Sequence, residues 1–223
     1  MKIAIIVAMG KELRLLLPML EDPREITLND VTFHTGDIGN HEIVAMQCGI
    51  GKVNAAVGAL TLIEHFHPDL VINTGVAGGT GSEAGILDVI VAEGVAYHDV
   101  WCGPGTEYGQ VQGMPRVYEC ALPADVIAKM PGVKSGLIAS GDIFVSKKSE
   151  VDHILSVHPQ AKAVDMESAA IAQVCHIKNV PFVCIRVISD TPGAADNIAQ
   201  YQNFWEDAPE KTFSTLLTLL KML

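Results

Sequence analysis

Apolar residues in this chain occur either in short unbroken runs or at every third or fourth position of a longer segment. An unbroken run predicts a strand that is covered on both faces, whereas the spaced pattern predicts an amphipathic helix. Strands are expected at residues 2–9, 31–37, 41–48, 69–74, 88–97, 135–139 and 182–188. Helices are expected at residues 11–20, 51–66, 123–130, 146–155 and 169–175, and from residue 207 onwards. This alternation predicts an α/β fold with some antiparallel content.

Several connections carry turn signals. Ile38-Gly39-Asn40 predicts a hairpin turn, and the glycine-rich sequence GVAGG at 75–79 predicts a tight turn after a buried strand. The segment Val100–Gly113 is rich in glycine and predicts an ordered loop or lid. The last helix is expected to open at Asp207 with Glu210 as its capping-box partner.

The apolar faces of two helices are also predicted by spacing. The inward residues of helix 51–66 are expected to be Val53, Ala56, Val57, Leu60 and Ile63. The inward residues of the last helix are expected to be Phe213, Leu216, Leu217 and Leu220.

The stretch from Ala163 to Asp190 reads as strand, helix and strand, with Asn179 and Pro181 ending the helix. Such a unit favours a parallel pair joined by a right-handed crossover. It leaves Glu167 and Asp190 just beyond the carboxyl ends of two strands, where ligands of open α/β sheets usually bind.

Composition excludes several classes of protein. The 223 residues carry a formal net charge of −11, which opposes binding to nucleic acid or an anionic membrane, and their 5% of aromatic residues offer few stacking surfaces. No apolar run reaches the roughly 20 residues of a membrane span. Five scattered cysteines without a CxxC pair indicate reduced thiols and a cytoplasmic protein. No linker or repeat interrupts the chain, so residues 1–223 are expected to form one domain.

The common cofactor and nucleophile motifs are missing from the sequence. The glycines at 75–79 match neither GxGxxG nor a P-loop, although such a turn could still cradle a phosphate or let a ligand approach closely. His98 and Asp99 could bind a metal or order a loop, but surface or core roles are favoured. No GxSxG serine or evident cysteine–histidine pair supports a covalent hydrolase. We therefore expect neither a metal nor an organic cofactor.

Two residues near predicted strand ends admit both a structural and a chemical interpretation. Glu12 could be a solvated glutamate in the first turn of a helix, which the helix dipole favours. Phe144 could fill the core or stack on a flat ring. Taken singly, each is better explained structurally.

Glu12, Glu167 and Asp190 nevertheless form a set of acidic residues near the ends of separate strands. The apolar neighbours of Glu167 and Asp190 can raise the pKa of a carboxyl group enough to keep a proton near neutral pH. An acid and a base of this kind suit cleavage of an acetal-like bond through an oxocarbenium-like transition state.

Eight motifs follow one another along nearly the whole chain: IIVAMGKE at 5–12, CGIGKVNAA at 48–56, VINTGVAGG at 71–79, AYHD at 96–99, EYGQ at 107–110, SGDIFV at 140–145, AVDMESAAIAQVCH at 163–176 and VISD at 187–190. In order and separation they resemble the 5′-methylthioadenosine/S-adenosylhomocysteine nucleosidases of the nucleoside phosphorylase/hydrolase superfamily. The resemblance implies a three-layer α/β/α fold with a central mixed, twisted sheet. It also implies a homodimer in which a neighbour's loop, here Val100–Gly113, helps to close the pocket around an adenosine-derived nucleoside.

The implied reaction is hydrolysis of the N-glycosidic bond of methylthioadenosine and adenosylhomocysteine, which releases adenine and the thioribose. By resemblance, Glu12 deprotonates the attacking water, and Asp190 donates a proton toward N7 of adenine while Ser189 holds its side chain. Glu167 accepts from the ribose hydroxyls and favours the cationic sugar. The other implied binding residues are Met166 against the ribose, Phe144 and Val145 at the adenine, and Gly78 and Met9 in the pocket wall.

The sequence departs from the family pattern at three places. Val76 stands where many of these nucleosidases have serine, and Asp165 replaces the commoner glutamate. In the loop Trp101–Gly105, Pro104 falls near the place of an aromatic residue of the alkylthio pocket. These departures affect the expected 5′ substituent more than the chemistry.

A nucleoside phosphorylase and a non-catalytic purine-binding protein fit this sequence less well. A nucleoside phosphorylase needs an arginine to bind phosphate, but Asn73 and Val76 occupy the places of arginine and serine, and neither Arg24 nor Arg186 is evidently placed to substitute. A non-catalytic purine-binding protein would not need both an acid and a base. A nucleosidase that prefers another adenosine derivative, such as aminodeoxyfutalosine, stays open.

Overall fold

The structure, a computed structural model, describes residues 1–28, 30–81, 84–207 and 211–223. Its strands are β1 (Lys2–Val7), β2 (Glu21–Leu28), β3 (Val31–Ile38), β4 (His41–Gln47), β5 (Leu70–Gly79), β6 (Val89–Tyr97), β7 (Tyr118–Glu119), β8 (Val133–Ser140), β9 (Ala161–Asp165) and β10 (Phe182–Asp190). Its helices are α1 (Gly10–Leu16), the 3₁₀ turn η1 (Leu17–Met19), α2 (Lys52–Phe66), α3 (Ala124–Ile127), α4 (Lys148–Val157), α5 (Ser168–Lys178), α6 (Asn197–Asp207) and α7 (Lys211–Leu220).

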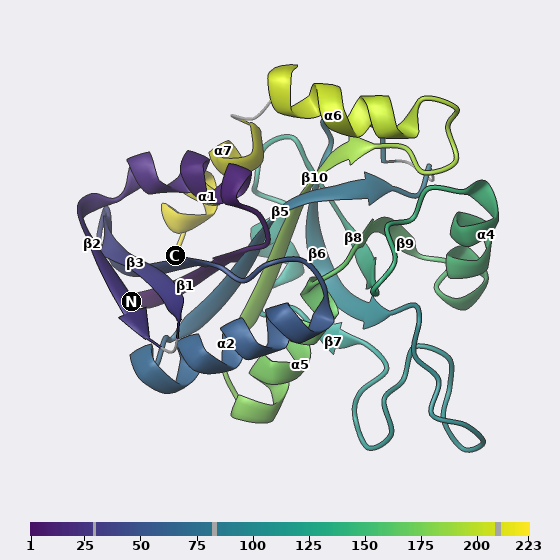
Figure 1. Cartoon of the computed structure of the whole chain (residues 1–223), viewed down its shortest axis with the longest axis horizontal. Helices are drawn as coiled ribbons and strands as arrows, with labels where there is room; N and C mark the ends of the chain where they lie inside the picture. The colour runs from purple at the N-terminus through teal and green to yellow at the C-terminus, as the bar shows by residue number, and fades with distance from the viewer. Residues whose placement is uncertain (29, 82–83, 208–210) are drawn as a thin grey trace.

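Helices cover both faces of a single mixed sheet, which confirms the predicted α/β/α layers (Figure 1). Helices α2 and α5 pack on one face, and α1, α6 and α7 lie over the other. Successive residues of β1 serve the two layers in turn, since Ala4 and Ile6 join the core under α2 and α5 while Ile3 and Ile5 join the core under α7. Burial on both faces explains why the central strands are almost continuously apolar.

Five of the strands close into a ring. Strand β5 pairs in parallel with β10, and its last two residues pair antiparallel with β9. The ring runs onward from β10 through β6 and β8 to β9, while β1, β4, β3 and β2 extend the sheet beyond β5 as an open arm. The hairpin of β3 and β4 lies where the sequence predicted it.

The prediction of a turn at GVAGG is wrong, because β5 continues to Gly79. These glycines allow close packing instead of chain reversal. A Cβ atom at Gly79 would lie 2.8 Å from the carbonyl oxygen of Ala84, and one at Gly78 would lie 2.7 Å from Cγ of Pro192. Two neighbouring strands and the segments that follow them meet at this point, so no side chain fits.

The prediction of a parallel pair flanking α5 is also wrong. Strands β9 and β10 are not neighbours: β9 pairs with β8 and β5, and β10 pairs with β5 and β6. Helix α5 therefore connects two positions of the ring across one face of the sheet. The carboxyl ends of both strands still open toward the same cavity, as described below.

The inward face of α2 differs from the prediction except at Ile63, which is buried as expected. The residues buried against the sheet and α5 are mainly small, namely Ala55, Gly58, Ala59, Leu62 and Ile63, whereas Val53 and Val57 are exposed and Leu60 is 37% exposed. A Cβ at Gly58 would lie 2.7 Å from Cε of Met46, so this helix approaches the sheet too closely for large residues. The larger apolar side chains are left on the outer face.

The C-terminal region contains α6, which the sequence pattern did not predict, before α7. Asp207 ends α6 and does not open the last helix, and the proposed capping partner Glu210 lies outside the described residues. In α7 the predicted inward residues Phe213, Leu216 and Leu220 are buried, whereas Leu217 is only partly buried and Leu219 is buried in its place. Residues 100–113 form a loop without helix or strand, as predicted.

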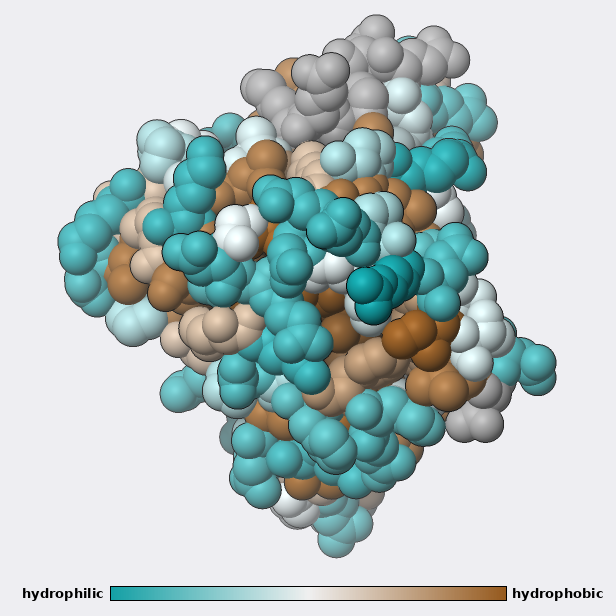
Figure 2. Space-filling model, turned by 90° about the vertical axis from the view of Figure 1, so that its left-hand side faces the viewer, coloured by the Kyte–Doolittle hydropathy of each residue, from teal (hydrophilic) through white to brown (hydrophobic). Residues whose placement is uncertain are grey.

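Within the described ranges, no helix has the length and apolar character to cross a membrane. On the face seen from the side of the open arm, hydrophobic residues gather in the middle of an otherwise largely hydrophilic surface (Figure 2).

We predict that Gly79→Ala destabilises the fold by about 1–3 kcal/mol, because the new methyl group meets a backbone oxygen that cannot move freely. Gly85→Ala is the matched control, since its Cβ meets only Asp88 Oδ2 at 3.7 Å. Urea unfolding at one protein concentration measures both. Equal stability of the two variants would show that the ring tolerates a side chain at position 79.

Candidate active site

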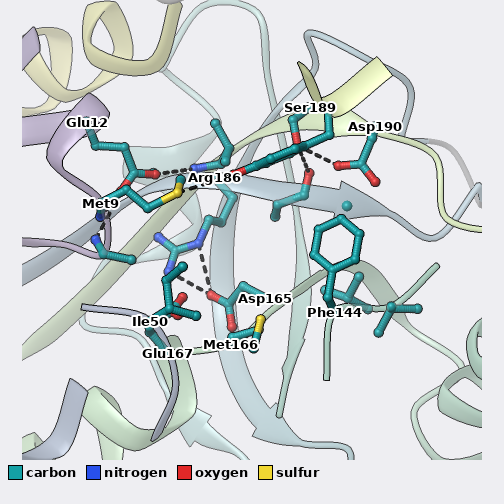
Figure 3. Close-up of a pocket in the computed structure, with 18 of the residues that line it drawn as sticks. Met9, Glu12, Ile50, Phe144, Asp165, Met166, Glu167, Arg186, Ser189 and Asp190 are labelled. Carbon is teal, nitrogen blue, oxygen red and sulfur yellow. Dashed lines mark hydrogen bonds and ion pairs between the residues drawn. The ribbon is translucent and has the colours of Figure 1, made fainter. Parts of the chain in front are cut away.

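A cavity opens at the carboxyl ends of β1, β5, β9 and β10, and the segment after β8 and helix α6 complete its wall. The structure brings all nine residues singled out from the sequence to this cavity: Met9, Glu12, Gly78, Phe144, Val145, Met166, Glu167, Ser189 and Asp190. Glu12 lies toward one side and Asp190 toward the other, with Arg186 between them and Phe144 on the side of Asp190 (Figure 3).

Glu12 is 1% exposed, so it is not the solvated helix residue that its position alone favoured. It lies in the first turn of α1, and its carboxylate accepts backbone N–H groups from Ala8 at 3.0 Å, Met9 at 2.9 Å and Val76 at 3.1 Å. Burial raises the pKa of Glu12, while these N–H groups and Arg186 act in the opposite direction. The result is a carboxylate held rigidly in an apolar wall.

Gly75 provides the space for that carboxylate. A Cβ atom at this position would lie 2.4 Å from Oε1 of Glu12. The glycines of β5 therefore do permit a close approach, as one interpretation of the sequence allowed, but the group that approaches Gly75 is the protein's own carboxylate.

Asp190 is the last residue of β10 and is 3% exposed. Its Oδ1 accepts a hydrogen bond from Oγ of Ser189 at 2.6 Å, and its Oδ2 accepts one from Nδ2 of Asn197 in α6. Burial raises the pKa of Asp190, and the bonds from Ser189 and Asn197 only oppose that effect. A carboxyl group in this setting retains its proton to a higher pH than an ordinary aspartate.

Glu167 follows β9 and is the residue before α5. Its Oε1 accepts the backbone N–H of Gly51 at 2.9 Å, at the start of α2. Burial, followed by the charge of Asp165, raises the pKa of Glu167 to about 7, and Arg186 acts against this rise. Glu167 therefore titrates near neutral pH.

Arg186 lies beneath the cavity and is 2% exposed. Its Nε donates to Asp165 Oδ2 at 2.9 Å, and its Nη2 lies 2.7 Å from the same oxygen. Nη2 also donates to Asn73 Oδ1, and Nη1 donates to the carbonyl of Ile185 at 3.1 Å. Asp165, the shorter replacement for the family's glutamate, thus has a defined structural partner. The guanidinium of this ion pair places a positive charge beneath the carboxylates of Glu12 and Glu167, while Asp165 acts on Glu167 with the opposite sign.

Exposed apolar side chains form the wall where it meets solvent. Phe144 is 48% exposed and lies edge-on to Tyr201 at 5.7 Å, so it is available as a stacking surface and is not a core residue. The hydroxyl of Tyr201 donates to the sulfur of Met9 at 3.2 Å. Ile50 also lines the cavity and is 53% exposed.

Four residues of the site were missed or set aside in the sequence: Arg186, Asn197, Tyr201 and Ile50. A signal existed for Arg186, because a single cation inside the apolar strand VCIRVIS must have a buried partner. Asn197 and Tyr201 belong to α6, for which no pattern was found. His98 is buried with an unpartnered Nε2, and the described residues contain no group of His, Cys, Asp or Glu side chains arranged to hold a metal.

Comparison with known proteins extends over the whole length of the chain. The sequence model of the phosphorylase superfamily matches residues 2–221. A 5′-methylthioadenosine/S-adenosylhomocysteine nucleosidase of Geobacillus sp. (strain WCH70) is 39% identical over 231 residues, covering 100% of this chain and 99% of the relative.

Solved structures agree. An S-adenosylhomocysteine nucleosidase from Streptococcus pyogenes in complex with 5-methylthiotubericidin has a TM-score of 0.93 at 39% identity, covering 100% of this chain and 97% of its own. A futalosine hydrolase mutant of Helicobacter pylori strain 26695 has a TM-score of 0.91 at 29% identity, covering 100% and 99%.

A match along nearly every residue places the protein in the phosphorylase superfamily. Identity of 39% over full length narrows the assignment, and the chain belongs to the family of 5′-methylthioadenosine/S-adenosylhomocysteine nucleosidases. This confirms the resemblance seen in the motifs.

We predict that Glu167→Gln changes stability in a pH-dependent way. Below the ordinary glutamate pKa, residue 167 of the wild type is protonated in both the folded and the unfolded states. As the pH rises toward 7, the unfolded state loses its proton first, so the wild type loses stability relative to the variant by roughly 3 kcal/mol. Unfolding free energies between pH 4.5 and 8 measure the difference.

The control for this experiment is Glu64→Gln. Glu64 is exposed and bonded to Lys178 at 2.7 Å, which lowers its pKa, so its replacement should have a small effect of opposite sign. A stability difference for Glu167→Gln that stays flat across the pH range would contradict the raised pKa.

Proposed function

We propose that this protein hydrolyses the N-glycosidic bond of 5′-methylthioadenosine and S-adenosylhomocysteine, releasing adenine and the thioribose. The observation that carries the proposal is the pair of buried carboxyl groups, Glu12 and Asp190, on opposite sides of one cavity (Figure 3). Glycosidic cleavage needs a proton for the leaving group and a nucleophile for the anomeric carbon. The two groups are placed to serve these two ends of the bond.

Asp190 is the proposed general acid. Burial raises its pKa, so the carboxyl group retains a proton that it can deliver toward N7 of the purine, and the base leaves neutral. Ser189 and Asn197 each bond one oxygen of the carboxyl group and so fix its direction. Phe144 stands on the same side of the cavity, where it would stack on the purine ring, and the buried Val145 would meet the purine edge.

Glu12 is the proposed general base that orients and deprotonates the attacking water. Three backbone N–H groups hold its carboxylate in place, so it is preorganised before the substrate binds. Arg186 opposes the rise in the pKa of Glu12 that burial causes, and so favours the ionised form that a base requires. Met9, next to this carboxylate, and Gly78 complete the wall around the sugar.

Glu167 is the proposed partner of the ribose. Its carboxylate accepts hydroxyl hydrogen bonds, and its negative charge favours the sugar as positive charge develops in the transition state. Met166 lies beside it in the wall and would pack against the ribose. The activity is expected to need no metal or organic cofactor.

Water is favoured over phosphate as the nucleophile. Of the described residues that line the cavity, Arg186 is the only cation, and its guanidinium already donates to Asp165, Asn73 and the carbonyl of Ile185. A phosphate dianion needs an arginine with free donors. Arg186 does reach the site, but its contacts already use four of its five N–H donors, so it cannot bind phosphate with two parallel hydrogen bonds without breaking one of them.

The preferred 5′ substituent is a separate question. The structural similarity to a futalosine hydrolase of Helicobacter pylori keeps other 5′-substituted adenosines, such as aminodeoxyfutalosine, as a second candidate substrate class. The hydroxyl of Tyr201 gives the cavity a polar group that such a substituent could use.

We also infer a homodimer. The outer face of α2 carries the exposed apolar residues Val53, Val57 and Leu60, and Ile50 continues this face to the cavity rim. Trp101 and Tyr108 stack on each other at 5.5 Å on the exposed 100–113 loop. A second copy on this apolar face would bring a neighbour's loop to the rim of the pocket. Unpaired cysteines suit a cytoplasmic protein.

We expect adenine and free methylthioribose from methylthioadenosine in the absence of phosphate. Chromatography of the products, with and without phosphate, measures this, and adenosylhomocysteine and aminodeoxyfutalosine serve as parallel substrates. A strict phosphate requirement with a sugar 1-phosphate product would replace the hydrolase by a phosphorylase. Absence of adenine release from every substrate would contradict the enzymatic function.

We expect Asp190→Asn to lower kcat by roughly 10²–10⁴-fold, because the amide keeps the shape of the carboxyl group but cannot transfer its proton. Asp196→Asn is the matched control: this exposed aspartate lies a short distance along the chain and bonds only to Gln200. Near-normal turnover of Asp190→Asn would remove Asp190 from the role of general acid.

A further inference from the structure

The first turn of α2 is held by carboxylates from other parts of the chain. Its N-cap residue is Gly51, which has no side chain to cap the helix. Glu167 Oε1 accepts the N–H of Gly51 at 2.9 Å, and Asp142 Oδ1 accepts the N–H of Lys52 at 2.7 Å. Two free N–H groups of the helix end are thereby satisfied, one of them by the carboxylate proposed to bind ribose.

Asp142 is in turn held by the segment after β6. Asp99 Oδ2 accepts both the backbone N–H of Asp142 at 2.8 Å and the ammonium group of Lys52 at 2.9 Å. That ammonium group also lies 3.9 Å from Asp142 Oδ2 and 5.5 Å from the ring of Tyr97. Lys52, Asp99 and Asp142 thus form a closed network across three separate segments, with side chains of Lys52 and Asp99 only 25% and 15% exposed.

Close packing leaves this network little freedom. A Cβ atom at Gly141 would lie 2.6 Å from Cε1 of His98 and 2.7 Å from Cγ of Asp99. One at Gly51 would lie 3.0 Å from Asp142 Oδ1. The three segments therefore meet at two glycines without intervening side chains, and a shift of one segment must move the others.

None of the three charged residues lines the cavity, yet both ends of the network reach it. At one end, Gly51 holds Glu167. At the other, Asp142 immediately precedes Ile143, Phe144 and Val145, which form the cavity wall. We propose that Lys52, Asp99 and Asp142 are positioning residues that set the Gly51 N–H against Glu167 and so hold this carboxylate in its place at the cavity. The inference rests on the proposed function and assigns it a set of supporting residues.

The physical reason lies in the surroundings of Glu167. The charged groups that act on it are Asp165 and Glu12, which disfavour its ionisation, and Arg186, which favours it. The N–H of Gly51 adds a hydrogen bond to the ionised form. If the start of α2 moves away, the carboxylate loses this bond and protonates at a higher pH.

The test is a pH series of kcat/KM for Asp142→Ala and Lys52→Met. We expect each to lower kcat/KM at neutral pH by about tenfold, as a small misplacement of a binding group does, and to move the acidic limb of the profile to higher pH. Asp142→Asn keeps an acceptor oxygen for the N–H of Lys52 and should restore most of the activity. Asp152→Ala and Lys148→Met break an exposed pair at 2.9 Å and serve as controls that leave kcat/KM unchanged.

A second measurement does not depend on activity. In the Asp142→Ala background, the pH range over which Glu167→Gln gains stability should extend to higher pH than in the wild-type background. An inactive wild type would contradict the proposed function and leave this measurement to decide the inference. If the pH profiles of stability and of kcat/KM do not shift, or if the variants keep the same kcat/KM as the exposed-pair controls, the positioning role is wrong. The proposed hydrolase function would not be affected by that result.

Discussion

The ion pair between Arg186 and Asp165 is the interaction on which the site depends. A fully buried guanidinium is costly unless its donors are satisfied, and here Asp165, Asn73 and the Ile185 carbonyl take them up. Asn73 in turn donates to the carbonyl of Ile6, so one cation joins β1, β5, β9 and β10 at the level of the cavity floor. The same charge favours the ionised forms of Glu12 and Glu167, which are buried nearby.

The pKa values of the three carboxyl groups in the cavity are shifted by the same main cause, but the groups that oppose the shift differ. Burial raises the pKa of Glu12, Glu167 and Asp190 alike. Arg186 opposes the rise at Glu12 and Glu167, whereas at Asp190 the opposing groups are the neutral Ser189 and Asn197. A positive charge therefore acts on Glu12 and Glu167, whereas only neutral hydrogen-bond donors act on Asp190. Enzymes commonly separate acid from base in this way, by environment and not by residue type.

Much of this arrangement was predictable from sequence, for physical reasons that particular residues illustrate. Unbroken apolar runs identified the central strands, and their carboxyl ends carried Glu12, Glu167 and Asp190. The spacing of apolar residues gave a wrong prediction where the size of a side chain mattered more than its hydropathy. Helix α2 packs against the sheet through Gly58 and leaves Val57 exposed. The sequence pattern also failed where glycines served packing, as at Gly75–Gly79 in β5. The pairing of β9 and β10 could not be foreseen, because ring closure is decided by contacts between distant segments.

The ring also sets the order in which the protein can be completed. The hydroxyl oxygen of Ser189 lies 3.3 Å from the carbonyl oxygen of Ala77, a residue 112 positions earlier in the chain, and β10 closes the ring against β5. Contacts of such separation form late and slowly, because a long loop must close first. The glycines at the end of β5 leave the ribosome well before Val164 and Pro192, which pack against Gly78. The cavity is therefore the last part of the molecule to be assembled, and a nascent chain that stops short of β10 exposes an unpaired edge of β5 in its place.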